Sequence, residues 1–227
     1  MRCGIFGKLP AKRDFVAVGA PREFLQVWEA WMQGGLSASR QQLGAGWQEA
    51  FLRAPIWRFW LGPDLCGFPV LGAFMPSVDG VGRYFPLTIF ARPDPGEELP
   101  PPEIEPHDEW FGRAEDLLLS ALAEGADYSA VSAGAEALSG SAAGTPKVDT
   151  SEIIRTGGCL VGPFDPSAPA RMFEAFRRLD PGPVYAAMSY WWTVGGDEYP
   201  ARALSSRRMP DPYIYARMLT GRFDDGR

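Results

Sequence analysis

The sequence contains a single histidine, His107, and three cysteines, Cys3, Cys66 and Cys159, with no CxxC spacing. Catalytic triads and zinc sites that depend on histidine therefore have at most one candidate. That histidine follows a proline-rich stretch, and we expect it on an exposed loop or at a helix cap. An odd number of scattered cysteines fits a reduced, cytoplasmic setting. We expect no metal and no cofactor.

Phosphate-binding glycine loops, long apolar runs and basic blocks are also missing. Neither GxxxxGK[ST] nor GxGxxG occurs, and Pro10 removes a backbone donor from the stretch after Gly7 and Lys8. No run of about 18 apolar residues predicts a membrane span, and the N-terminal residues lack a signal-peptide pattern. The net charge of -6 disfavours nucleic acid and anionic lipid as partners.

The length of the chain allows one substantial hydrophobic core. The 227 residues are 46% hydrophobic and 22% charged, which is typical of a globular protein that needs no disulfide or metal to fold. Residues 93–106 are rich in proline and acid and predict an extended connection. We therefore expect a single domain over residues 1–227, with two packed halves, 1–92 and 107–227, as the alternative.

Three apolar runs predict strands at Ile56–Leu61, Pro69–Met75 and Tyr84–Ala91. The second and third of these runs are apolar at odd and even positions, which indicates a sheet covered on both faces. Further strands are expected at Cys3–Phe6, Gly158–Gly162 and Val184–Val194, and helices from Pro21, around Trp47, around Trp110, from Ser167 and from Asp211. The predicted fold is α/β (α+β), with a mixed, largely antiparallel sheet and helices on both faces.

The stretch MPSVDGVGRYFPLTIF, from Met75 to Phe90, carries Ser77, Asp79 and Arg83 between apolar runs. One interpretation is an active site in which these residues act as nucleophile, acid and oxyanion clamp, as in a hydrolase or phosphatase. A serine nucleophile needs a base, however, and no histidine or lysine lies nearby in the sequence.

The other interpretation of this stretch is a rigid turn. Pro76 ends the incoming strand, and Gly80 and Gly82 allow positive φ. The side chain of Asp79, or that of Ser77, would accept backbone N–H groups two or three residues on. Arg83 would then lock the turn through a carboxylate, either Asp79 or Asp14.

The eight tryptophans exceed what a core of this size requires, although core packing is the expected role for most of them. Trp191 and Trp192 point to opposite faces of the predicted strand, so one of them is expected to be exposed or to line a groove. An exposed tryptophan would suggest a protein-binding surface. A pocket lined by Trp57, Trp60 or Trp192 would instead suggest a small-ligand sensor.

Five motifs carry a family resemblance. They are GIFGKLPAKRDFV (Gly4–Val16), WEAWMQ (Trp28–Gln33), APIWRFWL (Ala54–Leu61), GAFMPSVDGVGRYFPLTIFA (Gly72–Ala91) and SYWWTVGG (Ser189–Gly196). In this order they resemble the TagF family of type VI secretion system accessory proteins. The sequence departs from the family pattern at Arg13, where that pattern favours glycine.

The resemblance implies a non-catalytic, cytoplasmic bacterial regulator that represses type VI secretion after translation. Its implied partner is the forkhead-associated (FHA) scaffold protein of the system, and no nucleic acid or membrane insertion is implied. Because such domains read phosphothreonine, often with a preference three residues on, Thr150 followed by Ile153 is a possible phospho-site.

The motif residues that the resemblance carries over fall into two groups. Polar loop residues are expected to bind the partner: Lys8, Asp14, Ser77, Asp79 and Arg83. The others are expected to be architectural: Gly7, Pro10, Phe15, Trp28, Trp57, Pro76, Gly82 and Pro86.

Overall fold

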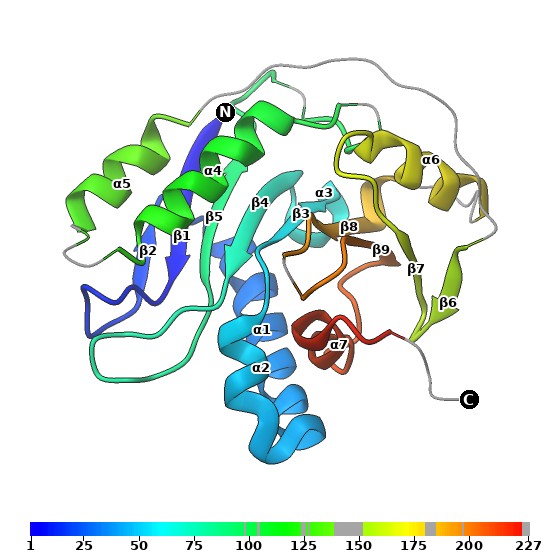
Figure 1. Cartoon of the computed structure of the whole chain (residues 1–227). Coiled ribbons are helices and arrows are strands. Elements are labelled where there is room, and N and C mark those ends of the chain that lie inside the picture. The colour runs from blue at the N-terminus through cyan, green and yellow to red at the C-terminus, as the bar shows by residue number, and fades with distance from the viewer. Residues whose placement is uncertain are drawn as a thin grey trace.

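An antiparallel sheet of nine strands runs through the molecule (Figure 1). The computed structural model describes residues 1–97, 99–103, 105–123, 126, 128–138, 152–179, 185–196 and 198–223. The strands are β1 (Arg2–Gly7), β2 (Val16–Val18), β3 (Trp57–Leu61), β4 (Val70–Met75), β5 (Leu87–Arg92), β6 (Ile154–Thr156), β7 (Cys159–Pro163), β8 (Met188–Thr193) and β9 (Arg202–Arg207). Their order across the sheet is β2-β1-β5-β4-β3-β8-β9-β7-β6, and every pair among these strands is antiparallel.

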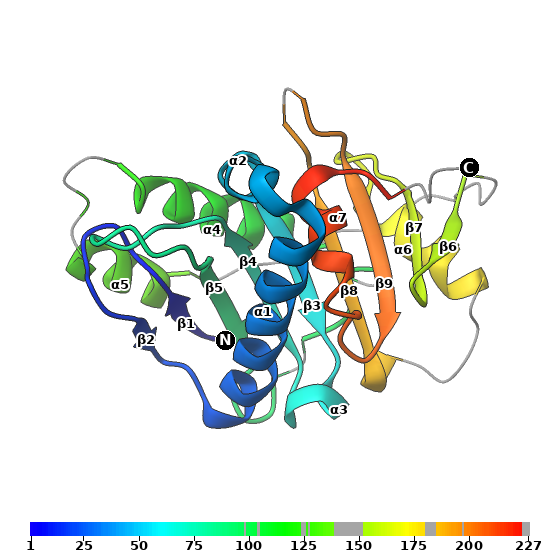
Figure 2. The same cartoon turned by 90° about the horizontal axis from the view of Figure 1, so that it is seen from below.

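Helices cover both faces of this sheet, as predicted. The helices are α1 (Arg22–Leu43), α2 (Trp47–Arg53), α3 (Pro63–Cys66), α4 (Asp108–Ser120), α5 (Tyr128–Glu136), α6 (Pro169–Leu179) and α7 (Ile214–Thr220), with 3-10 turns at Gly44–Gly46 and Tyr185–Ala187. Helices α4, α5 and α6 lie on one face, and α1, α2 and α7 lie on the other (Figures 1 and 2). The α+β class and the antiparallel sheet are thereby confirmed. In the part of the chain described, no helix is long and apolar enough to cross a membrane.

The core beneath α1 is built around Trp28. Its indole stacks on Phe59 of β3, with ring centroids 4.2 Å apart, and lies nearly parallel to Trp191 of β8 at 5.7 Å. The indole Nε1 donates to Thr88 Oγ1 at 3.1 Å, so the one polar atom of this buried ring is satisfied. The expected architectural role of Trp28 thus has a physical basis.

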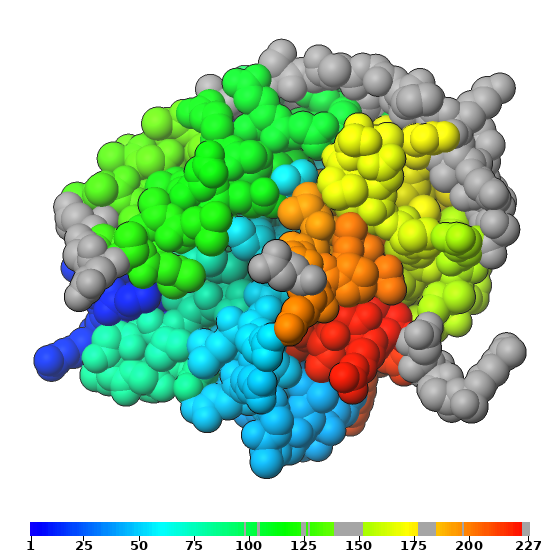
Figure 3. All heavy atoms as spheres, viewed as in Figure 1, coloured from blue at the N-terminus to red at the C-terminus, as the bar shows by residue number. Residues whose placement is uncertain are grey.

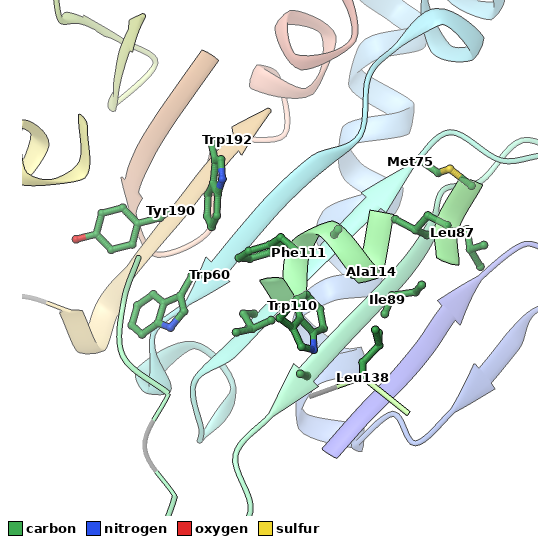
Figure 4. Packing of buried hydrophobic residues seen from close by; sticks show 14 of the residues in the cluster. Trp60, Met75, Leu87, Ile89, Trp110, Phe111, Ala114, Leu138, Tyr190 and Trp192 are labelled. Carbon is green, nitrogen blue, oxygen red and sulfur yellow. The ribbon is translucent and has the colours of Figure 1, made fainter. Parts of the chain in front are cut away.

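The core on the opposite face lies beneath α4 and α6. Figure 4 shows Phe111 of α4 beside Trp192 of β8, whose ring centroids are 4.9 Å apart. Trp60 of β3 also faces this side, and its Nε1 donates to Leu99 O at 3.1 Å. The proline-rich connection is therefore held against the sheet at Leu99.

Strands β3 and β8 join the two parts of the chain on either side of residues 93–106. They pair over the register Arg58↔Trp192 to Leu61↔Ser189, within one continuous sheet. The single domain over residues 1–227, with two packed halves, 1–92 and 107–227, as the alternative, stays a prediction.

Two expectations about aromatic residues are wrong. Trp191 and Trp192 do face opposite sides of β8, but both are buried, because helices cover both faces of the sheet. Trp57 and Trp60 are buried as well, so these indoles fill the cores and do not line an open ligand pocket.

The expected exposure of His107 is also wrong. Of the two expected positions, an exposed loop or a helix cap, His107 occupies the helix cap before α4. Its side chain is nevertheless only 4% exposed. Its Nε2 lies 3.1 Å from Pro100 O, beneath the proline-rich connection. The strand expected at Val184–Val194 begins later, at Met188, after the 3-10 turn. The candidate phospho-site Thr150 lies outside the described residues.

Replacement of Trp28 by alanine tests the first core. Trp28→Ala removes a fully buried ring and leaves a cavity, so we expect the free energy of unfolding to fall by about 3–5 kcal/mol in urea denaturation. Leu52→Ala on α2 is the control, since Leu52 is 54% exposed and should change stability by less than about 0.5 kcal/mol. Equal effects of the two substitutions would contradict the packing described for Trp28.

Candidate functional site

Two loops far apart in sequence meet at one end of the sheet. Residues 8–15 follow β1, and residues 76–86 connect β4 to β5. Because β1 pairs with β5 up to the register Gly7↔Leu87, the loops leave the sheet side by side. We call residues 8–15 and 76–86 the paired-loop site. In Figure 3 it forms the edge where the blue N-terminal loop adjoins the teal loop.

The carboxylate of Asp79 is the centre of this site. Its Oδ1 accepts the backbone N–H groups of Val81 at 3.1 Å and of Arg83 at 2.9 Å. Its Oδ2 accepts the guanidinium Nε of Arg83 at 2.7 Å and a short hydrogen bond from Lys8 Nζ. Backbone groups close the turn, since Asp79 N donates to Arg83 O and Gly82 N donates to Asp79 O.

The Asp79 carboxylate is held in its ionised form. The side chain is fully buried, and burial alone would raise its pKa. The hydrogen bonds from Lys8, from Arg83 and from the N–H of Val81 outweigh burial and hold the pKa well below its usual range. Lys8 is 5% exposed, and its ammonium also lies 4.6 Å from the ring centroid of Phe15. A buried cation and a buried anion therefore neutralise one another here.

Arg83 links the two loops. Besides Asp79, its guanidinium donates to the backbone carbonyl of Arg13. A second backbone link runs from Gly80 N to Lys12 O at 2.9 Å. The predicted turn locked by Arg83 and Asp79 is confirmed, with Asp79 rather than Asp14 as the carboxylate.

Backbone geometry explains why glycine occupies two positions of these loops. Gly7 has φ +134°, and a Cβ there would lie 2.0 Å from Pro86 O, so no larger residue fits where the loops part. Gly82 has φ +85°, as expected for the turn, whereas Gly80 does not have positive φ. Pro76 follows the last residue of β4, as predicted.

The five predicted partner-binding residues differ in exposure. Lys8, Ser77 and Asp79 are buried, while Asp14 and Arg83 are exposed. The buried three would therefore influence a partner only by holding the loops in place. Their role in binding stays a prediction.

The motif residues expected to be architectural also differ in exposure. Trp57 is buried, and its Nε1 donates to Met218 O. Phe15, expected to be architectural, packs on Phe6 and Phe85 but remains 47% exposed. Pro10 is exposed as well.

Sequence reasoning missed the contact of Lys8 with Asp79. The two residues are 71 positions apart, and only the pairing of β1 with β5 brings them together. Within the described ranges, no group of three or more His, Cys, Asp or Glu side chains is placed to hold a metal ion.

The structure defines an α+β protein with a doubly covered antiparallel sheet and two ion-paired loops at one end. The family model for the TagF N-terminal domain, Type VI secretion system-associated, matches residues 4–138, which include both loops. A crystal structure of PA0076 from Pseudomonas aeruginosa PAO1 is similar, with 32% sequence identity and a TM-score of 0.70. The match covers 98% of this chain and 96% of that one. The search of curated proteins found no match. The chain belongs to the TagF family, which is associated with type VI secretion.

Substitutions at the ion pair should differ in their effect on stability. We expect Asp79→Asn to lower the urea midpoint at pH 7 more than Arg83→Gln does. Asp79→Asn leaves the buried ammonium of Lys8 without an anion, whereas the Arg83 side chain is 57% exposed and can be hydrated. The double variant Lys8→Met/Asp79→Asn should recover part of the loss, because no buried charge then lacks its partner. A double variant less stable than Asp79→Asn would contradict this.

Acid should reduce the contribution of Asp79. Its pKa in the folded protein is lowered, so the stability it supplies is complete above the unfolded value of about 3.9 and is lost as the pH falls towards the folded pKa. We expect the stability difference between wild type and Asp79→Asn to be constant from about pH 7 to about pH 5 and to shrink below about pH 4. Urea titrations across this range measure it, and a difference that widens in acid would exclude the assignment.

Proposed function

We propose that the protein is a non-catalytic regulator that represses type VI secretion after translation, by binding the FHA scaffold protein of the system in the cytoplasm. The observation that carries the proposal is family membership, since the matched family is associated with type VI secretion. The likeness to PA0076 extends over almost the entire chain, so the fold beyond residues 4–138 also occurs in a solved protein.

The state of the candidate catalytic residues supports a non-catalytic role. Ser77 is 2% exposed, and its Oγ has no hydrogen-bond partner among the described residues, so no base activates it there. Asp79 is already engaged by four donors. A carboxylate whose pKa is lowered in this way is a poor general acid at neutral pH.

The burial of the tryptophans weighs against the sensor alternative. Trp57 contacts Tyr199 and Phe223 through edge-on ring packing, and its N–H is satisfied by a backbone carbonyl. Trp192 is enclosed by Phe111 and Phe173. A ligand would have to displace these packed rings to reach either indole.

Deletion of the protein in its native bacterium should increase type VI secretion, because a repressor has been removed. Complementation with wild type should restore repression, and so should Ser77→Ala, because a regulator that acts by binding does not need this hydroxyl. The measurement is the amount of a protein secreted by the type VI system in culture supernatants. The cellular level of each variant is the control.

Two results would count against the proposal. Unchanged secretion in the deletion strain would remove the repressor role. A folded and normally abundant Ser77→Ala variant that fails to repress would favour the enzyme alternative instead.

A further inference from the structure

The paired-loop site exposes two large apolar side chains, one on each loop. Phe15 is 47% exposed and Val81 is 54% exposed. Phe15 is the aromatic residue that contacts Lys8, and Val81 lies in the turn closed by Asp79. Half-exposed aromatic residues held by packing on one side are frequent anchors in protein interfaces.

The charge of this site is opposite to that of the whole chain. Residues 8–15 and 76–86 contain four cations, Lys8, Lys12, Arg13 and Arg83, and two anions, Asp14 and Asp79, which gives +2 in a chain of net charge -6. Of the two anions Asp79 is buried and Asp14 is exposed, whereas three of the four cations are exposed, so the exposed surface is basic. In the described part of the chain, neither Lys12 nor Arg13 forms an ion pair with a carboxylate.

The exposed groups are displayed on a backbone that is already fixed. Gly80 N binds Lys12 O, Arg83 binds the carbonyl of Arg13, and Asp79 joins the two loops through Lys8. A surface that is ordered before binding loses little conformational entropy when a partner docks. Rigid display of cations beside an aromatic ring therefore favours a specific ligand of opposite charge.

We propose that Lys12, Arg13, Phe15, Val81 and Arg83 form the docking surface for an acidic segment of the protein partner, with an apolar side chain of that segment seated against Phe15 and Val81. Guanidinium groups match carboxylates in geometry as well as charge. A phospholipid surface fits less well, because the remainder of this chain is acidic and would be repelled. The inference rests on the proposed function, since the partner is the FHA scaffold protein.

The test compares two variants that differ in location but not in chemistry. Lys12→Glu/Val81→Asp alters the docking surface and leaves the side chains of Lys8, Asp79 and Arg83 unchanged, because Val81 contributes only its backbone N–H to Asp79. Leu119→Asp/Arg207→Glu is the matched control, because it also replaces one exposed aliphatic residue and one exposed cation, with the same change in charge, on other elements. Circular dichroism and urea denaturation confirm that both variants are folded.

Isothermal titration calorimetry with the purified full-length FHA scaffold protein gives the affinities. We expect Kd to rise at least about tenfold for the docking variant, to stay within about twofold of wild type for the control, and to rise with salt for the wild type. A second docking variant, Arg13→Glu, should weaken binding in the same direction.

The outcomes separate this inference from the proposed function. If wild type and docking variant bind equally, or if salt has no effect on the wild type, the inference is overturned while repression through the scaffold stands. If wild type does not bind, the proposed partner and the docking surface fall together. If wild type, but not the docking variant, sediments with phosphatidylcholine vesicles containing phosphatidylserine, the surface serves a lipid membrane and the proposal is wrong.

Discussion

The coverage of the central strands on both faces is the constraint on which the rest of the structure depends. Every residue of β3 and β4 is buried, so both faces are mostly apolar, and a buried polar group needs a partner inside the protein, as Arg58 of β3 has in Glu115. The indole N–H groups of Trp28, Trp57 and Trp60 meet this need through a threonine hydroxyl on β5 and carbonyls of α7 and the proline-rich connection. That connection is consequently part of the core and not a free linker.

The paired-loop site follows from the same constraint at the end of the sheet. Where β1 and β5 leave the sheet together, helices cover the loops only in part, through Trp47 and Phe51 of α2 on Tyr84 and through Tyr128 of α5 at Lys12. The loops therefore also bind backbone groups of their own. Asp79 does this with one carboxylate, which receives two backbone N–H groups and two cations. Asp79 offsets only part of the positive charge of the site, and the side chains of Lys12, Arg13 and Arg83 are exposed on a fixed backbone.

What the sequence could predict depended on distance along the chain. The pairing of Arg83 with Asp79 is local, four residues apart, and the turn residues between them made it predictable. The contact of Lys8 with Asp79 was not predictable, because apolar runs reveal strands but not the order in which they pair. One of Trp191 and Trp192 was expected at a surface or in a groove, although continuous apolarity in neighbouring strands had already indicated two covered faces. Applied consistently, that pattern would have placed both tryptophans of β8 in the cores.

The split between buried and exposed residues changes how binding data on this site should be interpreted. A substitution of Asp79 that abolishes partner binding would not place Asp79 in the interface, because its loss releases the loops that carry Arg13 and Phe15. The exposed side chains of Lys12 and Val81 report contact more directly, since neither side chain is among the donors to Asp79. The buried residues of the two motifs therefore build the surface, and the side chains proposed to recognise a partner are exposed residues of the same motifs.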